Sequence, residues 1–94
     1  MTLRERDIER ALVTRIKALG GEVRKVKWIG RKNAPDRVVM ARDAYIWRTV
    51  WVELKAPGKR PTPAQVREHD RMREVGQCVI VIDSQELIDL HFPR

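Results

Sequence analysis

The chain has 94 residues, which allows one domain and, because so short a chain buries little apolar surface, favours an oligomer. Its net charge of +7 favours nucleic acid as a partner, since basic residues bind phosphates irrespective of sequence, although a merely basic protein is an alternative. A single cysteine excludes an internal disulfide, and with no apolar signal segment or membrane span we expect an intracellular, cytoplasmic protein.

The N-terminal segment predicts a helix from Leu3 to Leu19. Thr2 and Glu5 have the spacing of a capping box, and Gly20-Gly21 is a typical stop. The apolar residues at helical spacing are Ile8, Leu12, Ile16 and Leu19. Glu9 borders this apolar face, where a carboxylate without a partner is unexpected.

Three strands are predicted next. Residues Glu22 to Ile29 alternate apolar and basic side chains, which indicates an edge strand. After a loop over residues 30–35, a short strand runs from Asp36 to Ala41, with a turn at 42–44. The run from Ile46 to Lys55 is dense in β-formers and predicts a central strand.

Prolines separate this strand from a helix that runs from Pro63 to about Val75, with a capping box formed by Thr62 and Gln65. A buried strand, Cys78 to Ile82, and a short terminal helix follow. The first three strands can pair as an antiparallel meander, and the helical crossover makes the fourth strand parallel to the third. The expected fold class is therefore α/β, a mixed sheet flanked by helices.

Two acids and a lysine form the candidate catalytic site. Glu53 and Lys55 lie two residues apart at the end of the predicted central strand, so they project from the same face. Asp36, from a neighbouring segment, can complete a two-carboxylate site for a hard divalent cation such as Mg²⁺. The Leu54 carbonyl could add an oxygen ligand. Lys55 could orient an attacking water or stabilise the transition state of phosphodiester hydrolysis.

Each part of this pattern also has an ordinary explanation. Pro-Asp is a frequent turn dipeptide, and Glu-x-Lys is common in any charged protein. Their position at neighbouring strand ends, each beside basic residues, favours the catalytic interpretation. The tryptophans Trp28, Trp47 and Trp51 are expected in the core or an interface, although Trp28 could stack on an unpaired base. His69 is expected at the surface or an interface.

Three segments carry a resemblance to a known family. They are Asn33-Ala34-Pro35-Asp36, the run from Trp51 to Gly58 that contains Glu-Leu-Lys-Ala-Pro-Gly, and Thr62-Pro63-Ala64-Gln65. Together they resemble the virus-type replication–repair nuclease (VRR-NUC) domain of the PD-(D/E)xK superfamily. Ala34 stands where that family often has glycine. The resemblance implies a restriction-endonuclease-like fold with an αβββαβ core and a single nuclease domain over residues 1–94.

The resemblance also implies roles for individual residues. Asp36 and Glu53 match metal ligands, Lys55 matches the catalytic lysine, Gln65 matches an accessory active-site residue, and Glu9 matches an acid that the first helix contributes to the metal site. The capping box for Gln65 and a surface ion pair for Glu9 are the alternatives. The expected phosphate-binding residues are Arg24, Lys25, Lys27, Arg31, Lys32, Lys59 and Arg60.

The leading hypothesis is a Mg²⁺- or Mn²⁺-dependent endonuclease, and the resemblance to stand-alone members of the family implies that it cuts branched DNA, such as Holliday junctions, as a homodimer. Two-fold symmetry would present two equivalent sites for paired cuts. The alternatives are a nonspecific or restriction-type endonuclease, a non-catalytic DNA-binding module on the same fold, and a small basic scaffold. Sequence-specific cutting would need additional elements that reach into a groove, for which the chain has little room.

Overall fold

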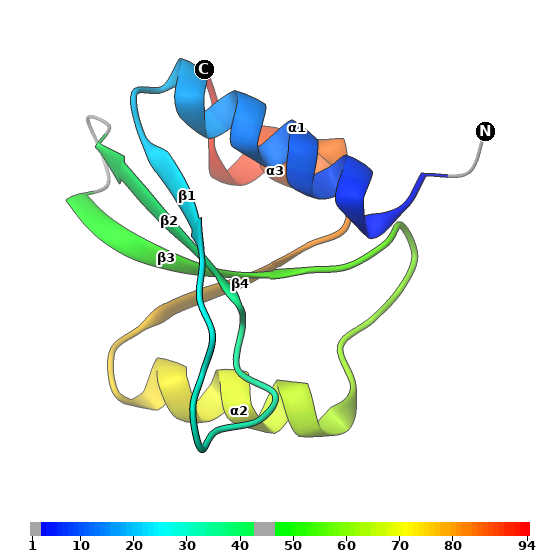
Figure 1. Cartoon of the computed structure of the whole chain (residues 1–94), viewed down its shortest axis with the longest axis vertical. Coiled ribbons are helices and arrows are strands. Elements are labelled where there is room, and N and C mark those ends of the chain that lie inside the picture. The colour runs from blue at the N-terminus through cyan, green and yellow to red at the C-terminus, as the bar shows by residue number, and fades with distance from the viewer. Residues whose placement is uncertain (1–2, 43–46) are drawn as a thin grey trace.

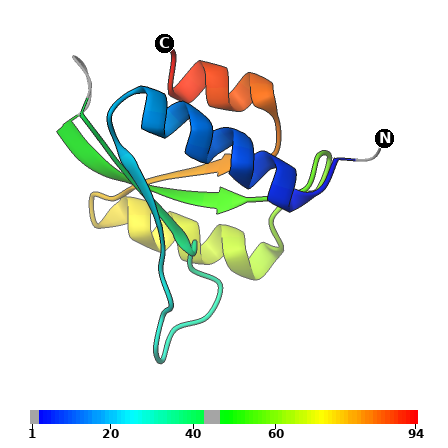
Figure 2. The ribbon, with the colours of Figure 1, turned by 45° about the horizontal axis from the view of Figure 1, so that its top comes forward.

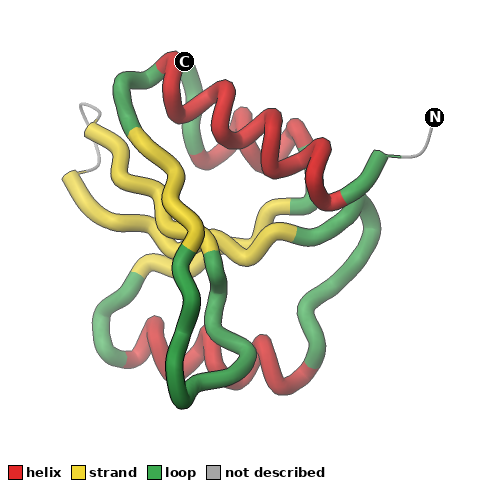
Figure 3. Tube along the Cα trace, in the orientation of Figure 1, coloured by secondary structure: helices red, strands yellow, loops and turns green. Residues whose placement is uncertain are grey.

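The computed structural model describes residues 3–42 and 47–94. The elements in chain order are α1 (Glu5–Ala18), β1 (Glu22–Lys25), β2 (Arg37–Arg42), β3 (Trp47–Leu54), α2 (Pro63–Glu74), β4 (Cys78–Ile82) and α3 (Gln85–His91). The strands form one sheet, which separates α1 and α3 on one face from α2 on the other (Figure 1). Figure 3 shows the same three layers, with strands between two groups of helices.

The sheet has the predicted mixed topology. Its strand order is β1-β2-β3-β4, with β1–β2 and β2–β3 antiparallel and β3–β4 parallel. The predicted meander, the crossover through α2 and the central place of β3 are all confirmed. The fold class predicted from the sequence, α/β with an αβββαβ order, is therefore correct. Of the turn predicted at residues 42–44, Arg42 is the last residue of β2, and residues 43 and 44 lie outside the part of the chain that the structure describes.

Helix α1 begins later than predicted. Arg4 takes the N-cap position with an extended backbone, and its N–H donates to the Asp7 carboxylate at 2.8 Å. Asp7, rather than Glu5, therefore satisfies the free amide at this end, and Thr2 lies outside the described residues. At the other end Gly21 approaches the sheet so closely that a Cβ there would lie 2.5 Å from the Met40 carbonyl oxygen. In the described part of the chain, no helix is long and apolar enough to cross a membrane.

Strand β1 is shorter than predicted, because it ends at Lys25, where its partner β2 begins at Arg37. One further backbone bond joins Val26 to Asp36 at 2.9 Å, and the chain then leaves the sheet. The residues from Val26 to Asp36 form the β1–β2 loop. Figure 2 shows this loop extending away from the sheet on the side of α2. The predicted strand to Ile29 is therefore wrong at its C-terminal end, because the β-formers there have no partner strand.

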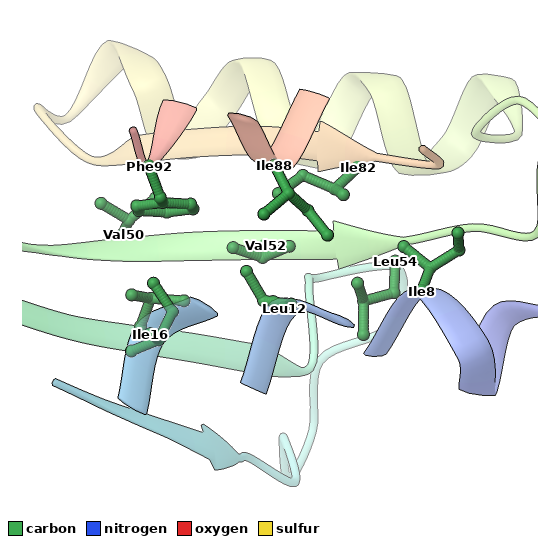
Figure 4. Close-up of a cluster of buried hydrophobic side chains, with 10 residues drawn as sticks. Ile8, Leu12, Ile16, Val50, Val52, Leu54, Ile82, Ile88 and Phe92 are labelled. Atoms are coloured by element: carbon green, nitrogen blue, oxygen red, sulfur yellow. The ribbon is translucent and has the colours of Figure 1, made fainter. Parts of the chain in front are cut away.

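The apolar core lies between the sheet and the α1/α3 layer (Figure 4). Leu12, Ile16, Val52, Ile82 and Ile88 are completely buried there. On β3, Val50, Val52 and Leu54 all belong to this core. Because side chains alternate along a strand, the residues between them face α2. The two faces of β3 therefore carry different kinds of residues.

Candidate active site

The α2 face of β3 carries the residues that the sequence singled out. Trp51, Glu53 and Lys55 alternate with the core residues of the same strand, so they project toward α2. Glu53 is buried, with 8% of its surface exposed, and Lys55 is half-buried. A carboxylate and an ammonium group thus stand side by side where β3 ends, as predicted.

Helix α2 places a buried histidine against Glu53. The His69 Nε2 atom lies 3.1 Å from Glu53 Oε1, and only 1% of His69 is exposed. The prediction that His69 lies at the surface or an interface is therefore wrong. It is buried because α2 turns the side chain of His69 inward onto the sheet, together with Glu68 and Met72. A buried carboxylate needs a hydrogen-bond partner, and His69 provides one for Glu53.

Burial raises the pKa of the Glu53 carboxyl above its ordinary value. The hydrogen bond and charge of His69 and the charge of Lys55 oppose this rise, whereas the nearby Asp36 carboxylate adds to it by repulsion. A buried carboxyl group whose pKa is raised further by a neighbouring carboxylate is a favourable place for a cation. A bound cation would relieve both the burial cost and the repulsion.

Asp36 lies where the β1–β2 loop enters β2, directly after the buried Pro35. Its carboxylate is half-exposed and contacts Arg37 Nη1 at 2.8 Å. The same Arg37 guanidinium is buried and also contacts the Glu9 carboxylate of α1. Its two acidic partners raise the pKa of Arg37 against the opposing effect of burial. Arg37 therefore joins α1 to the loop that carries Asp36.

The role implied for Glu9 differs from its observed contact. Glu9 is paired with Arg37 rather than brought to Glu53. Across residues 3–42 and 47–94, no three His, Cys, Asp or Glu side chains form a group that could hold a metal ion. The structure thus brings Asp36 toward Glu53. Glu9 contacts Arg37, which in turn contacts Asp36.

The donor set fits a hard divalent cation. Asp36 and Glu53 offer carboxylate oxygens, and Glu53 uses Oε1 for His69, which leaves Oε2 for a ligand. The Leu54 side chain lies in the core, so only its backbone carbonyl could contribute. Mg²⁺ typically takes one or two carboxylates and completes its shell with water and substrate oxygens. The residues present match that requirement.

Gln65 forms the predicted capping box at the start of α2. Its Oε1 atom accepts from the Thr62 N–H at 2.9 Å, and its own N–H donates to Thr62 Oγ1 at 3.1 Å. This arrangement fixes the first turn of the helix that carries His69. An accessory role for the Gln65 amide group in the active site is compatible with the box and stays a prediction.

The predicted phosphate-binding residues are all exposed: Arg24, Lys25, Lys27, Arg31, Lys32, Lys59 and Arg60. Lys25, Lys27 and Arg31 line a hollow of about 570 Å³ together with Asp36. Arg31 is less free than expected, because its Nε and Nη2 atoms both donate to the buried Glu68 at 2.8 Å. Arg24 pairs with Glu22 on the surface. The cationic side chains therefore border the candidate site chiefly through the β1–β2 loop.

The sequence patterns predict no site role for His69, Arg37 or Glu68, although each has a defined contact at the site. A signal for His69 was present, since it lies four residues after Gln65 and thus on the same face of a helix. Arg37 and Glu68 had no such signal, because their contacts depend on how α1 and the β1–β2 loop pack. Trp28 and Trp51 are half-buried rather than core residues. The Trp47 side chain lies outside the described part of the structure.

Comparison with known proteins gives two extensive similarities. No protein-family model matches the chain. It is 45% identical over 85 residues to the protein named "Putative nuclease p44" of Acyrthosiphon pisum secondary endosymbiont phage 1, covering 90% of this chain and 88% of that protein. A solved structure described as a VRR_NUC domain matches with a TM-score of 0.78 and 36% sequence identity, covering 92% of this chain and 90% of that one. The sequence comparison and the structure comparison thus agree, since one finds a protein named as a nuclease and the other a nuclease domain.

Proposed function

Because the chain belongs to the VRR-NUC family of nucleases, we propose that it is a divalent-metal-dependent DNA endonuclease that cuts branched DNA as a homodimer. The observation that carries the proposal is the arrangement at the end of β3, where the buried Glu53 stands beside Lys55 and near Asp36. A buried acid with a raised pKa beside a second acid is costly for the fold, which favours a functional reason for it.

Asp36 and Glu53 would hold the metal ion, with His69 fixing the Glu53 carboxylate. A bound Mg²⁺ or Mn²⁺ supplies a more acidic water and neutralises charge on the phosphate. Lys55 projects from the same face as Glu53 and would donate to the attacking water or to a phosphate oxygen. This mechanism uses no histidine as a base, since the His69 Nε2 atom is hydrogen-bonded to Glu53.

The substrate would be held by charge. The exposed cations of the β1–β2 loop, and Lys59 with Arg60 after β3, would contact phosphates without reading sequence. A two-fold dimer would place two equivalent sites on a junction, which supports paired cuts. The small size of the chain supports the same assembly, because association would bury additional apolar surface.

The experiment compares a labelled four-way junction with a linear duplex of the same arms, each with Mg²⁺, Mn²⁺ or EDTA. Wild-type protein is expected to make paired, metal-dependent cuts in the junction and to leave the duplex intact. Lys55→Ala is expected to bind the junction and to cut at least about 100-fold more slowly. Lys17→Ala, which removes an exposed lysine of α1, is the matched control and should cut normally.

Three results would contradict the proposal in different ways. Equal cutting of both substrates would indicate a general endonuclease. Tight binding without cutting under any metal would indicate a DNA-binding module. Single, unpaired cuts by a protein that sediments as a monomer would remove the dimer and leave the nuclease.

A further inference from the structure

A second hollow lies beside the candidate active site, between the β1–β2 loop, β3 and the C-terminal half of α2. We call it the indole pocket, and define it by Trp28, Trp51, Arg71, Met72, Val75 and Gln77. Its volume is about 550 Å³ and its lining is mainly apolar. Val75 is 76% exposed at its rim, although it is a large apolar residue. The proposed catalytic chemistry uses none of these side chains.

The two indole rings are fixed in place. Their centroids lie 5.2 Å apart with a tilt of 43°. The Trp28 Nε1–H donates to the Pro35 carbonyl at 2.9 Å, and the Trp51 Nε1–H donates to Gln77 Oε1 at 3.1 Å. Since both N–H groups are used, the rings offer apolar π surface to a ligand. Gln77 takes part through its oxygen, so its amide N–H groups can face the polar edge of that ligand.

The charges around the pocket balance. Arg31 and Arg71 both contact Glu68, and Glu74 is the other acid in the lining. A neutral, apolar pocket suits an uncharged planar ligand better than a phosphate. The cations lie next door, since Trp28 and Arg31 also line the hollow that holds Lys25, Lys27 and Asp36. A nucleic-acid strand could therefore keep its phosphates on the loop and place a base between loop and helix.

We propose that the indole pocket takes one unpaired nucleobase of the DNA substrate. The proposal rests on the proposed nuclease function and deepens it, because it names the feature that the enzyme selects. Trp51 precedes Glu53 by two positions on the same face of β3, a separation of about 7 Å. One extended nucleotide bridges such a distance. A pocket of about 550 Å³ admits a single base, whereas a base pair within a duplex cannot enter it.

The link to the catalytic acids is direct. The Trp28 indole holds the carbonyl of Pro35, and the next residue is Asp36. A base stacked on Trp28 would therefore steady the segment that presents a metal-binding carboxylate. A continuous duplex offers no unstacked base, so this segment would keep only the support that the Trp28–Pro35 hydrogen bond already provides. The enzyme would therefore select branched DNA by recognising an unstacked nucleotide at the branch point.

The test measures binding without cleavage, with Lys55→Ala in EDTA. A duplex with a single-stranded flap carries 2-aminopurine at the first unpaired nucleotide, and a matched blunt duplex carries it within a base pair. We expect saturable quenching of the flap probe, caused by stacking on an indole, and no change in the duplex probe. Trp28→Ala should weaken flap binding about five- to 100-fold and leave duplex binding unchanged.

Exposed positions keep the test independent of folding. Val75→Glu places a charge at the rim of the pocket and is expected to weaken flap binding about tenfold. Leu90→Glu makes the same change in charge on α3, where Leu90 is 70% exposed, and should bind both substrates normally. An unquenched flap probe at saturating protein would overturn the proposal, as would equal losses in the two variants. Dimer dissociation caused by Val75→Glu alone would also overturn it, because a second copy of the chain would then occupy the pocket.

Failure of this inference is distinguishable from failure of the proposed function. Metal-dependent cutting without quenching would remove the base pocket and leave the nuclease. Quenching of the flap probe without cutting by the wild-type protein would support the pocket and contradict the proposed activity.

Discussion

At the scale of single residues, the fold disfavours the ionised form of the buried Glu53 carboxyl when no cation is bound. Burial raises its pKa, and the repulsion from Asp36 adds to the effect. In the folded state the proton is therefore bound more tightly than in the unfolded state. The stabilising contribution of this proton is fully present below the ordinary value of 4.5 and is lost as the pH rises through the raised pKa.

Glu53→Gln is accordingly expected to raise the free energy of unfolding at pH 7 in EDTA, because the variant carries no buried charge. The difference from wild type should shrink toward zero as the pH falls below 4.5, and it should also shrink when Mg²⁺ is added at pH 7. Urea unfolding at a series of pH values measures both effects. A wild type more stable than the variant at pH 7 in EDTA would contradict the expectation.

His69 is the residue that makes the buried Glu53 tolerable. Removing its ring nitrogen in His69→Leu should lower the affinity for Mn²⁺ about 10- to 100-fold, since the carboxylate would lose its orienting partner. His69→Gln keeps a donor and should stay within a few-fold of wild type. Electron paramagnetic resonance of free Mn²⁺ gives the affinities. If the leucine variant binds Mn²⁺ as wild type does, His69 has only a packing role.

The motif spacing predicted the shared face of Glu53 and Lys55, because a period of two fixes the face on which residues of a strand project. It could not predict the state of Glu53. That state depends on His69, whose inward direction is decided by how α2 packs on the sheet. The same limit applies to Glu9, whose pairing with Arg37 arises from the packing of α1 against the loop.

At the scale of elements, the β1–β2 loop is tied to α2 by one acid. Glu68 accepts from Arg31 twice and from Arg71 at 3.1 Å, and 4% of it is exposed. The hydrogen bond and charge of Arg31, followed by those of Arg71, lower the pKa of Glu68. This acid therefore stabilises the fold at neutral pH, and its contribution is lost as the pH falls through the lowered pKa. Its response to pH is opposite to that of Glu53.

Glu68→Gln should loosen the loop without altering the sheet. We expect amide hydrogen exchange in residues 26–36 to become about two- to fivefold faster at pH 7, because a partly exposed ion pair contributes modestly. Asp70→Asn is the matched control, since Asp70 forms an exposed pair with Arg73 within the same helix. Equal exchange in the two variants would show that the Glu68 ion pairs do not hold the loop.

The elements themselves followed from periodicity and from proline and glycine positions. Helix α2 and strand β4 were predicted with boundaries within one residue of those observed, because a capping box and Gly76 mark the helix. The stretch from Val26 to Ile29 was mistaken for strand. Local β-propensity is present there, but β2 provides no partner beyond Arg37.

At the scale of the whole molecule, the apolar core and the candidate site lie on opposite faces of the sheet. The cluster of buried apolar residues lies on the α1/α3 side, as Figure 4 shows, whereas the candidate site and both hollows along the loop lie on the α2 side. Substitutions in the two layers should therefore have separable effects on unfolding and on metal binding.

Leu12→Ala is expected to lower the free energy of unfolding by about 2–5 kcal/mol, since Leu12 is completely buried in the core. The milder Ile16→Val should cost about 0.5–1.5 kcal/mol and ensures a folded sample. Mn²⁺ affinity of the folded protein should be unchanged in both. Urea unfolding and Mn²⁺ titration of the same samples decide the matter, and a parallel loss of affinity would mean that the layers are coupled.

The alternation along β3 also bears on how such a chain can diverge. Val50, Val52 and Leu54 are constrained by packing against α1 and α3, whereas Trp51, Glu53 and Lys55 lie on the opposite face, in the proposed DNA site. Since neighbouring residues in the strand never share a face, substitutions at the α2-facing positions can change the binding surface without changing the core. An insertion of one residue within β3 would instead move the core residues beyond it to the α2 face and the site residues into the core. We therefore expect homologues to differ in this strand by substitution and not by insertion.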